Sequence, residues 1–270
     1  VSVEDPTSLS VLGVVDSSDV LRRATASCLD TNASIAYVTS WESSSVVAVS
    51  YLNQSNPSIE GVVNNTEYLY GANNIACHLS NQTVFVASRE ADSIAVVNVS
   101  DSSSPHLIAG LADSTYLDGA NGIALDSTNE LLYVASVNYN GLTVVSVENL
   151  AEPVIVGWVV SETYMDFALR AAYDPDLEVV FVTGYDTSSV CAVDVTAREN
   201  PAVLDGVNSP TYMDKAYGVA IDQAKKLVFV SGLGSGSLAV LNMTRGFAPT
   251  TMPTLTLVPT PAPTVVREPD

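Results

Sequence analysis

The sequence predicts an all-β fold: a five-bladed β-propeller of 48-residue, four-stranded blades, closed by the N-terminal strand and followed by an extended Pro/Thr-rich C-terminal tail. Three observations predict this class. A 48-residue repeat runs through five copies without an insertion, each copy holds four short apolar segments between turn residues, and no stretch has a helical period.

The repeat is visible when single residues are followed in steps of 48. Tyr116 recurs in four copies, while Ala120 and Pro153 recur in all five. An aromatic residue followed by Val recurs at Tyr37, Phe85, Tyr133, Phe181 and Phe229. The predicted blades span approximately 24–71, 72–119, 120–167, 168–215 and 216–249.

The third copy shows the strands of one blade. They read NGIALD, LLYVAS, LTVVSV and VIVGWVV, and the turns between them read STNE, NYNG and NLAEP. The strands are almost continuously apolar, as expected where neighbouring blades cover both faces of each sheet.

The two ends of the chain predict how the ring closes. The fifth copy lacks an outer strand, and the segment 8–16 aligns with the outer strands of the other copies, because Gly13 lies 48 residues before Gly61. We therefore expect this segment to complete blade five and remove the open edge. The domain then covers 1–249, and the tail covers 250–270.

The outer half of each copy resembles the LVIVD-repeat propellers and, more loosely, the YVTN-type propellers. The resemblance is carried by YVASVNYNGLTVVSVENLAEPVIVGWV and by its counterparts that begin at Val84 and Val180. It covers about residues 8 to 249 and implies a secreted or cell-surface propeller, without supplying catalytic residues. The period here is longer than is usual for that family.

The bulk composition excludes some partners. Ten basic residues against 30 acidic ones give a formal net charge of −20, which disfavours nucleic acid and anionic membrane surfaces. No apolar run approaches 18 residues, so membrane insertion is not expected. The three cysteines do not fit a zinc spacing. Cys28 and Cys77 stand at neighbouring offsets of adjacent copies, so they are either one disulfide or buried thiols.

The tail and the sequons suggest an extracellular glycoprotein. Six Asn-X-Ser/Thr acceptors occur, at Asn32, Asn53, Asn64, Asn81, Asn98 and Asn242. The tail resembles O-glycosylated proline- and threonine-rich segments, and its candidate positions are Thr250, Thr251, Thr254, Thr256, Pro259, Thr260, Pro261, Pro263 and Thr264. The alternative is a plain linker.

The channel mouth is the default ligand site of a propeller. The loops that enter the inner strands carry Asp118, Asp166 and Asp214 at one repeat position, where the first copy has Arg22. Three carboxylates there would suit Ca²⁺, or each could simply cap its own turn. Asn73 and Asn121 follow in the same loops. No cofactor is otherwise indicated.

Further residues were weighed as ligands or as scaffold. The loops between the second and third strands vary, and they offer Trp41, Glu42, Arg89, Tyr139 and Tyr185. The repeated tyrosines could stack on sugars, although blade packing is the simpler reading; they are Tyr68, Tyr116, Tyr164 and Tyr212. The ring of turn residues Asp30, His78, Asp126, Asp174 and Asp222 is assigned to structure. Arg170 departs from its repeat counterparts, and we expect it to be salt-bridged.

The catalytic inventory is thin, because the two histidines form no recognisable nucleophile–base arrangement. We therefore expect no enzyme. The sequence favours an extracellular structural subunit of a fibre or coat that self-associates through its tail. The alternatives are a carbohydrate- or cation-binding receptor-like propeller on a stalk and, more remotely, a glycoside hydrolase.

Overall fold

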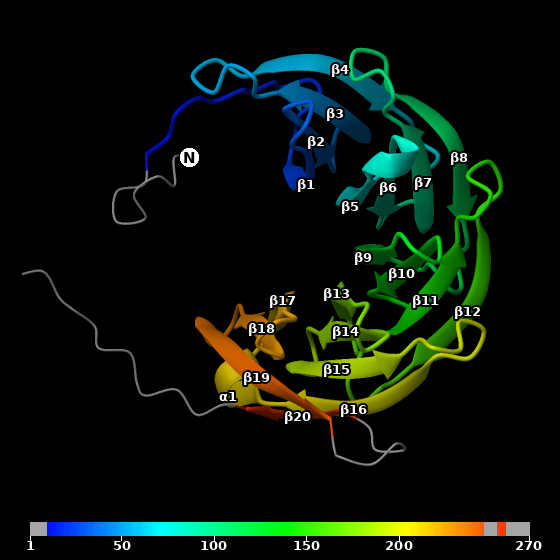
Figure 1. The fold of residues 1–270 in the computed structure, drawn as a ribbon, viewed down its shortest axis with the longest axis vertical. Helices are drawn as coiled ribbons and strands as arrows, with labels where there is room; N and C mark the ends of the chain where they lie inside the picture. The colour runs from blue at the N-terminus through cyan, green and yellow to red at the C-terminus, as the bar shows by residue number, and fades with distance from the viewer. Residues whose placement is uncertain (1–9, 246–252, 258–270) are drawn as a thin grey trace, which may run out of the picture.

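The computed structural model describes residues 10–245 and 253–257. Their fold is all-β, with five four-stranded antiparallel sheets that follow one another along the chain (Figure 1). We call these sheets blades one to five. Besides the strands, the described residues contain a 3₁₀ turn, η1 (Leu79–Asn81), and one short helix, α1 (Pro210–Met213).

Each blade runs from an inner to an outer strand in chain order. Blade one holds β1 (Ala24–Asp30), β2 (Ile35–Ser40), β3 (Ser45–Ser50) and β4 (Ser58–Asn64). Blade two holds β5 (Ala72–His78), β6 (Thr83–Ser88), β7 (Ser93–Asn98) and β8 (His106–Ala112). Blade three holds β9 (Ala120–Asp126), β10 (Leu131–Ser136), β11 (Gly141–Ser146) and β12 (Val154–Val160). Blade four holds β13 (Ala168–Asp174), β14 (Val179–Gly184), β15 (Ser189–Asp194) and β16 (Ala202–Asn208).

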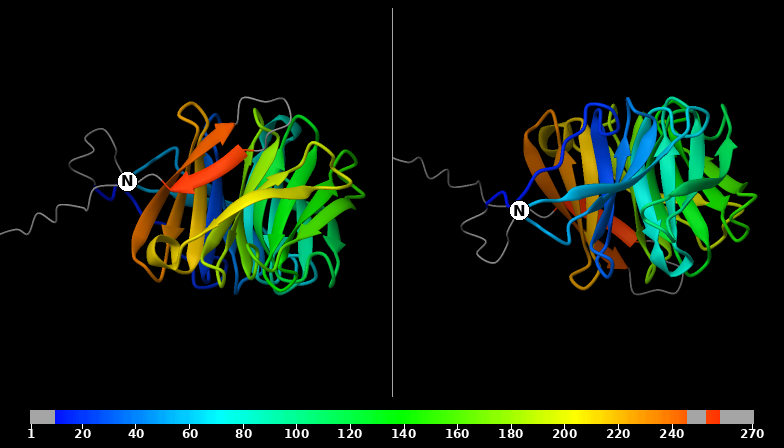
Figure 2. Two further views of the ribbon diagram at one scale, coloured as in Figure 1. Left: turned by 90° about the horizontal axis from the view of Figure 1, so that it is seen from below. Right: turned by 90° about the horizontal axis from the view of Figure 1, so that it is seen from above.

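Blade five holds β17 (Ala216–Asp222), β18 (Leu227–Gly232), β19 (Ser237–Arg245) and β20 (Pro253–Leu257). The number of blades agrees with the five copies of the repeat. The inner strands β1, β5, β9, β13 and β17 contact one another in that order and surround a central channel (Figures 1 and 2).

The ring has an opening between blade one and blade five (Figure 1). Closure by the N-terminal segment, which the sequence suggested, is not seen. β20 from the tail pairs with β19 and takes the outer position of blade five. Closeness in the chain explains this. Because β20 follows β19 after a short connection, their pairing costs little loop-closure entropy.

The N-terminal segment occupies an outer position of its own, next to blade one. A Cβ at Gly13 would meet the carbonyl of Gln54 and the ring of Pro57. A Cβ at Gly61 would meet Ser102 and Pro105 in the same way, one repeat later. The segment therefore lies against blade one as β4 lies against blade two, in the place of an outer strand that precedes the first blade.

The core lies between successive blades. One face of blade one, with Tyr37 and Val46, packs on the facing residues Val84 and Val97 of blade two. The same pattern recurs at the other three contacts between adjacent blades. The middle strands of blades two to four are therefore buried on both faces, and this explains why these strands are apolar without alternation.

The repeated turn aspartates are structural, as the sequence indicated. Asp126 accepts the backbone N–H groups of Thr128 and Asn129, and Asp174 accepts those of Asp176 and Leu177. Such turns replace missing backbone partners at the end of the inner strand. His78 takes the same place in blade two, where it is buried and bonded to Ser80, Asn81 and Glu130.

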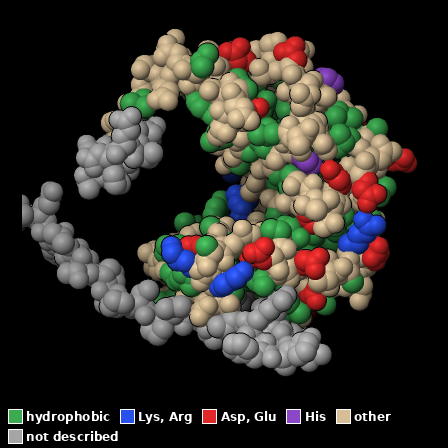
Figure 3. Space-filling view, in the orientation of Figure 1, with side chains coloured by type: hydrophobic (Ala, Val, Ile, Leu, Met, Phe, Trp, Pro, Cys, Tyr) green, Lys and Arg blue, Asp and Glu red, His purple; other side chains and the backbone are tan. Residues whose placement is uncertain are grey.

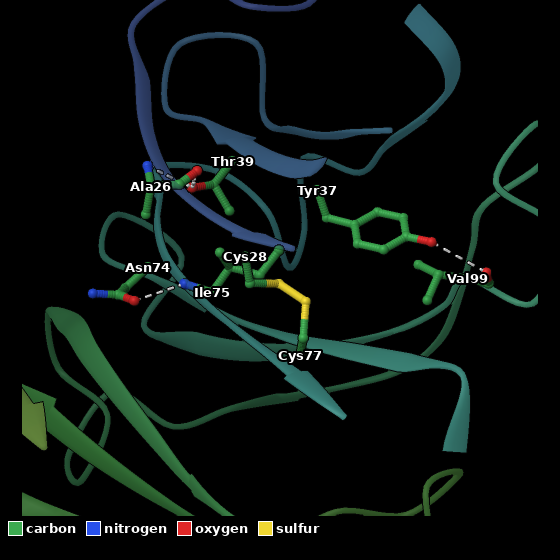
Figure 4. The surroundings of a disulfide bond; sticks show 8 residues. All are labelled: Ala26, Cys28, Tyr37, Thr39, Asn74, Ile75, Cys77 and Val99. Carbon is green, nitrogen blue, oxygen red and sulfur yellow. Dashed lines mark hydrogen bonds between the residues drawn. A yellow bond between two sulfur atoms is a disulfide. The ribbon is translucent and has the colours of Figure 1, made fainter. Parts of the chain in front are cut away.

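A disulfide joins Cys28 of β1 to Cys77 of β5, with a Cα–Cα distance of 5.9 Å (Figure 4). It therefore ties the inner strand of blade one to that of blade two. Cys191, the third cysteine, is buried as a free thiol in β15.

Candidate functional site

A cavity of about 460 Å³ lies at the mouth of the central channel. Residues of all five blades or of their entering loops line it. Its polar lining comprises three arginines and two asparagines, namely Arg23, Arg89, Arg170, Asn73 and Asn121. Its aromatic lining comprises Trp41, Phe167, Tyr185 and Tyr217. Three of the seven arginines of this acidic chain therefore converge on one hollow.

Arg170 is the best-held of these cations. Its guanidinium donates to Oδ1 of Asn73 at 3.2 Å and to the backbone oxygens of Asn121 and Leu169 at 3.4 Å. It also lies over the ring of Tyr217, at 5.5 Å from the ring centre. Burial lowers the pKa of Arg170, and the nearby Tyr217 raises it. The expected salt bridge is not present: within the described residues, Arg170 bonds to an amide and to carbonyls rather than to a carboxylate.

The two asparagines hold Arg170 in place. Nδ2 of Asn73 donates to Oδ1 of Asn121 at 2.6 Å, and Nδ2 of Asn121 donates to the backbone oxygen of Leu169 at 2.8 Å. Both amides are buried. This chain of hydrogen bonds crosses blades two, three and four, so the cation is fixed by the ring rather than by one loop.

The other two arginines lie against aromatic rings. Arg23 lies 4.7 Å from the centre of the Trp41 ring. Arg89 lies 5.1 Å from the centre of the Phe167 ring and 5.9 Å from that of Trp41. A guanidinium stacked on an aromatic face is oriented without being neutralised. The cavity therefore presents positive charge and flat apolar surface together.

Two of the lining residues occupy a strained backbone position. Arg23 and Phe167 have φ of 55°, and they stand at the same repeat position as Gly71 and Gly119, which have φ of 74° and 71°. Lys215 is the fifth member, with φ of 54°. Side chains other than glycine are costly in this left-handed region. Strain of this kind is often retained at functional sites.

The structure brings together some of the residues that the sequence singled out. Asn73, Asn121, Trp41, Arg89 and Tyr185 all line the cavity. Glu42 instead pairs with Arg22 at 3.0 Å on the exposed rim. Tyr139 packs edge-on against Tyr116, with ring centres 5.6 Å apart.

Two of the three mouth carboxylates bond to a neighbouring loop, and the third residue, Asp166, does so through its backbone. Oδ1 of Asp118 accepts from Asn138 at 2.8 Å, and Oδ1 of Asp214 accepts from Ser188 at 3.4 Å. The backbone oxygen of Asp166 accepts the N–H of Asp186 at 3.2 Å. Among the residues that the structure describes, no three His, Cys, Asp or Glu side chains gather closely enough to hold a metal ion.

Three of the four repeated tyrosines pack against outer strands, while Tyr212 is exposed. A Cβ at Gly110 would strike the ring of Tyr68, and one at Gly206 would strike that of Tyr164. Where the third copy has Trp158 at this position, Tyr116 lies on its ring with centres 4.3 Å apart. These tyrosines therefore anchor one strand to another.

The glycosylation candidates are placed in part. Asn32, Asn53, Asn64 and Asn81 are exposed, while Asn98, at the end of β7, and Asn242, inside β19, are half-buried. Nδ2 of Asn81 donates to the carboxylate of Glu130. Of the tail candidates, Thr254 and Thr256 belong to β20, and Thr250, Thr251, Pro259, Thr260, Pro261, Pro263 and Thr264 lie outside the described residues. In the described part of the chain, no helix has the length and hydropathy to cross a membrane.

The sequence reasoning missed Arg23, Phe167 and Tyr217. The signal for the first two was the repeat itself, since the position that holds Gly71 and Gly119 has an arginine and a phenylalanine in other copies. Tyr217 lies in β17 at the repeat position of Asn73 and Asn121, so the repeat offered a signal for it as well.

No protein-family model matches the sequence, and no curated protein matches it significantly. Several solved structures are similar in fold. A Lactobacillus plantarum protein is 15% identical, with a TM-score of 0.71, over 87% of this chain and 70% of that one. A candidate 6-phosphogluconolactonase from Bacteroides uniformis is 9% identical, with a TM-score of 0.70, over 87% of this chain and 71% of that one, and a periplasmic gluconolactonase from Pseudomonas aeruginosa is 13% identical, with a TM-score of 0.68, over 88% of this chain and 74% of that one. At these identities the likeness shows the propeller-like fold alone.

The names of these neighbours count against two of our expectations. We expected a structural fibre or coat subunit, or a receptor-like propeller, without enzymatic activity. Two of these neighbours carry enzyme names, a 6-phosphogluconolactonase and a gluconolactonase, and this finding contradicts the expectation. Our expectation rested on the absence of a recognisable nucleophile–base pair in the sequence. The cavity is built instead from arginines, amides and aromatic rings.

Proposed function

We propose that the channel-mouth cavity binds a lactone of an anionic sugar derivative and hydrolyses it. The observation that carries the proposal is the convergence of Arg23, Arg89 and Arg170 on one cavity in a chain of net charge −20. Three guanidinium groups gathered in one cavity repel one another, and an anionic ligand relieves this repulsion.

The lining supplies separate roles for a sugar-derived substrate. Arg23 and Arg89 stand at the aromatic side of the cavity, where a phosphate or carboxylate would meet guanidinium donors. Trp41 and Phe167 offer flat surfaces for the apolar face of a sugar ring. The names of the gluconolactonase and 6-phosphogluconolactonase neighbours support a lactone as the reacting group.

Arg170 is the residue suited to the chemical step. Water adds to the lactone carbonyl, the ring C–O bond breaks, and the released alkoxide takes a proton, so that the product is a hydroxy acid. Negative charge develops on the carbonyl oxygen before the bond breaks, and a fixed guanidinium stabilises that charge. Because Asn73 already fixes Arg170, little reorganisation is needed when the charge forms.

The test compares Arg170→Met with Arg198→Met. Proton release is followed with 6-phosphogluconolactone and with gluconolactone, each corrected for hydrolysis in buffer. Loss of one charge-assisted contact is worth about 1.5–3 kcal/mol, so Arg170→Met should lower kcat/KM by about ten- to a hundredfold. Arg198 is the matched control, because it is exposed and pairs with Glu148 and Glu199 far from the cavity.

Two outcomes contradict the proposal. One is a wild-type rate equal to that of buffer with both lactones. The other is an equal loss in the two variants while urea denaturation shows both to be folded.

A further inference from the structure

The opening of the ring exposes two blade faces whose counterparts are buried everywhere else in the described chain. Leu238 on β19 is 60% exposed, whereas the residues at the same repeat position in blades one to four are fully buried: Val46, Ile94, Leu142 and Val190. Phe229 on β18 is half-buried, whereas Phe181, Tyr133 and Phe85 are buried. No following blade covers this face of blade five.

Blade one shows the opposite face. Leu29 on β1 is 52% exposed. Ala36 and Val38 on β2 are half-buried, while their counterparts Val84 and Val86 are fully buried against the preceding blade. The opening seen in the ribbon is also hollow in the space-filling view (Figure 3).

The two exposed faces are complementary by construction. In each of blades one to four, the face equivalent to the one that carries Leu238 in blade five packs on the next blade. The face of that next blade is equivalent to the one that carries Leu29 and Val38 in blade one. That same contact is therefore made four times inside the molecule. An apolar surface of this kind, left uncovered, marks an interaction site.

We propose that a second copy of this chain occupies the opening, with blade five of one copy packed on blade one of the other. The contact continues an interface that the fold already uses four times.

The N-terminal segment limits how the two copies meet. Gly13 lies against blade one in the place of a preceding outer strand, and blade five carries β20 at that position of its own sheet. Docking therefore requires one of these two strands to leave the outer position. The contact is head-to-tail, because different faces of the two copies meet.

The experiment uses sedimentation velocity on the full chain over a range of concentrations. Wild-type protein should associate with rising concentration, and Leu238→Glu should weaken association at least tenfold. Leu29→Glu should do the same from the other face. Leu52→Glu is the matched control, because Leu52 is 81% exposed in a loop of blade one outside both faces.

A mixing arm tests the head-to-tail geometry. Leu238→Glu keeps an intact blade-one face, and Leu29→Glu keeps an intact blade-five face. Each variant alone should be monomeric, and an equal mixture should form dimers without larger species. The proposal is overturned if wild-type protein stays monomeric, which would mean that the opening is filled by the chain itself. It is also overturned if Leu52→Glu disrupts association as much as Leu238→Glu, or if the mixture does not associate.

Discussion

The residue before each inner strand has a left-handed backbone conformation. A substitution there can separate an effect on the free energy of unfolding from an effect on ligand affinity. Arg23 has φ of 55° at a position where two copies of the repeat have glycine. We consider Arg23→Gly and Arg23→Ala, which both remove the guanidinium and its contact with Trp41. They differ only in how well the new residue tolerates the backbone.

The magnitude follows from two opposing effects. The left-handed region costs a residue with a Cβ about 1–2 kcal/mol, which alanine keeps and glycine relieves. Glycine in turn loses about 0.5–1 kcal/mol through the greater freedom of the unfolded chain. The two ranges differ by about 0 to 1.5 kcal/mol, so Arg23→Gly should be more stable than Arg23→Ala by about 0.75 kcal/mol at their midpoints. Both variants lose the exposed cation–π contact, worth about 0.5–1 kcal/mol.

The assay is urea denaturation of both variants, together with calorimetric titration of 6-phosphogluconate. Both should bind this anion several-fold more weakly than the wild type, because Arg23 lines the cavity. Lys215→Gly and Lys215→Ala are the matched pair: Lys215 has φ of 54° but does not line the cavity. They should show the same difference in stability with unchanged affinity. Equal stability of Arg23→Gly and Arg23→Ala would refute the argument from backbone strain.

Two further predictions concern the cysteines. Replacing both Cys28 and Cys77 by serine should lower the free energy of unfolding by about 2–4 kcal/mol in urea denaturation, since the bond closes a long loop; an unchanged midpoint would contradict this. Burial raises the pKa of Cys191 to about 12, so above pH 9 the unfolded chain loses a proton that the folded chain keeps. Stability should therefore fall by up to about 1.4 kcal/mol per pH unit between pH 9 and 12, and Cys191→Ala should show a shallower fall.

The sequence was sufficient for the all-β class and for the five sheets, because a 48-residue repeat places a turn at the same offset in every blade. It was not sufficient for the ring geometry. The outer strands recur at the repeat spacing of 48 residues. By that spacing the segment around Gly13 was as good a candidate for the outer strand of blade five as β20. Only the local hairpin between β19 and β20 decides between them.

The site was predicted in part, for a related reason. A repeat makes deviations visible, and Trp41, Arg89 and Tyr185 were found as variable loop residues. The carboxylates of Asp118 and Asp214 attracted attention through their charge, although the structure uses them to hold loops. The direction in which a residue projects depends on its backbone conformation, and Arg23 gave no sign of its left-handed φ beyond the glycines at the equivalent positions.

Because of the bond between Cys28 and Cys77, the two ends of the open ring do not detach with equal ease. Blade one and blade five each have a neighbouring blade on one side only, and in a repeat architecture such terminal units are the first to detach. The disulfide fixes the inner strand of blade one to blade two, while blade five is held by non-covalent contacts, which include the ion pair between Lys226 and Asp176. Unravelling of the ring therefore begins at blade five and proceeds toward the N-terminus.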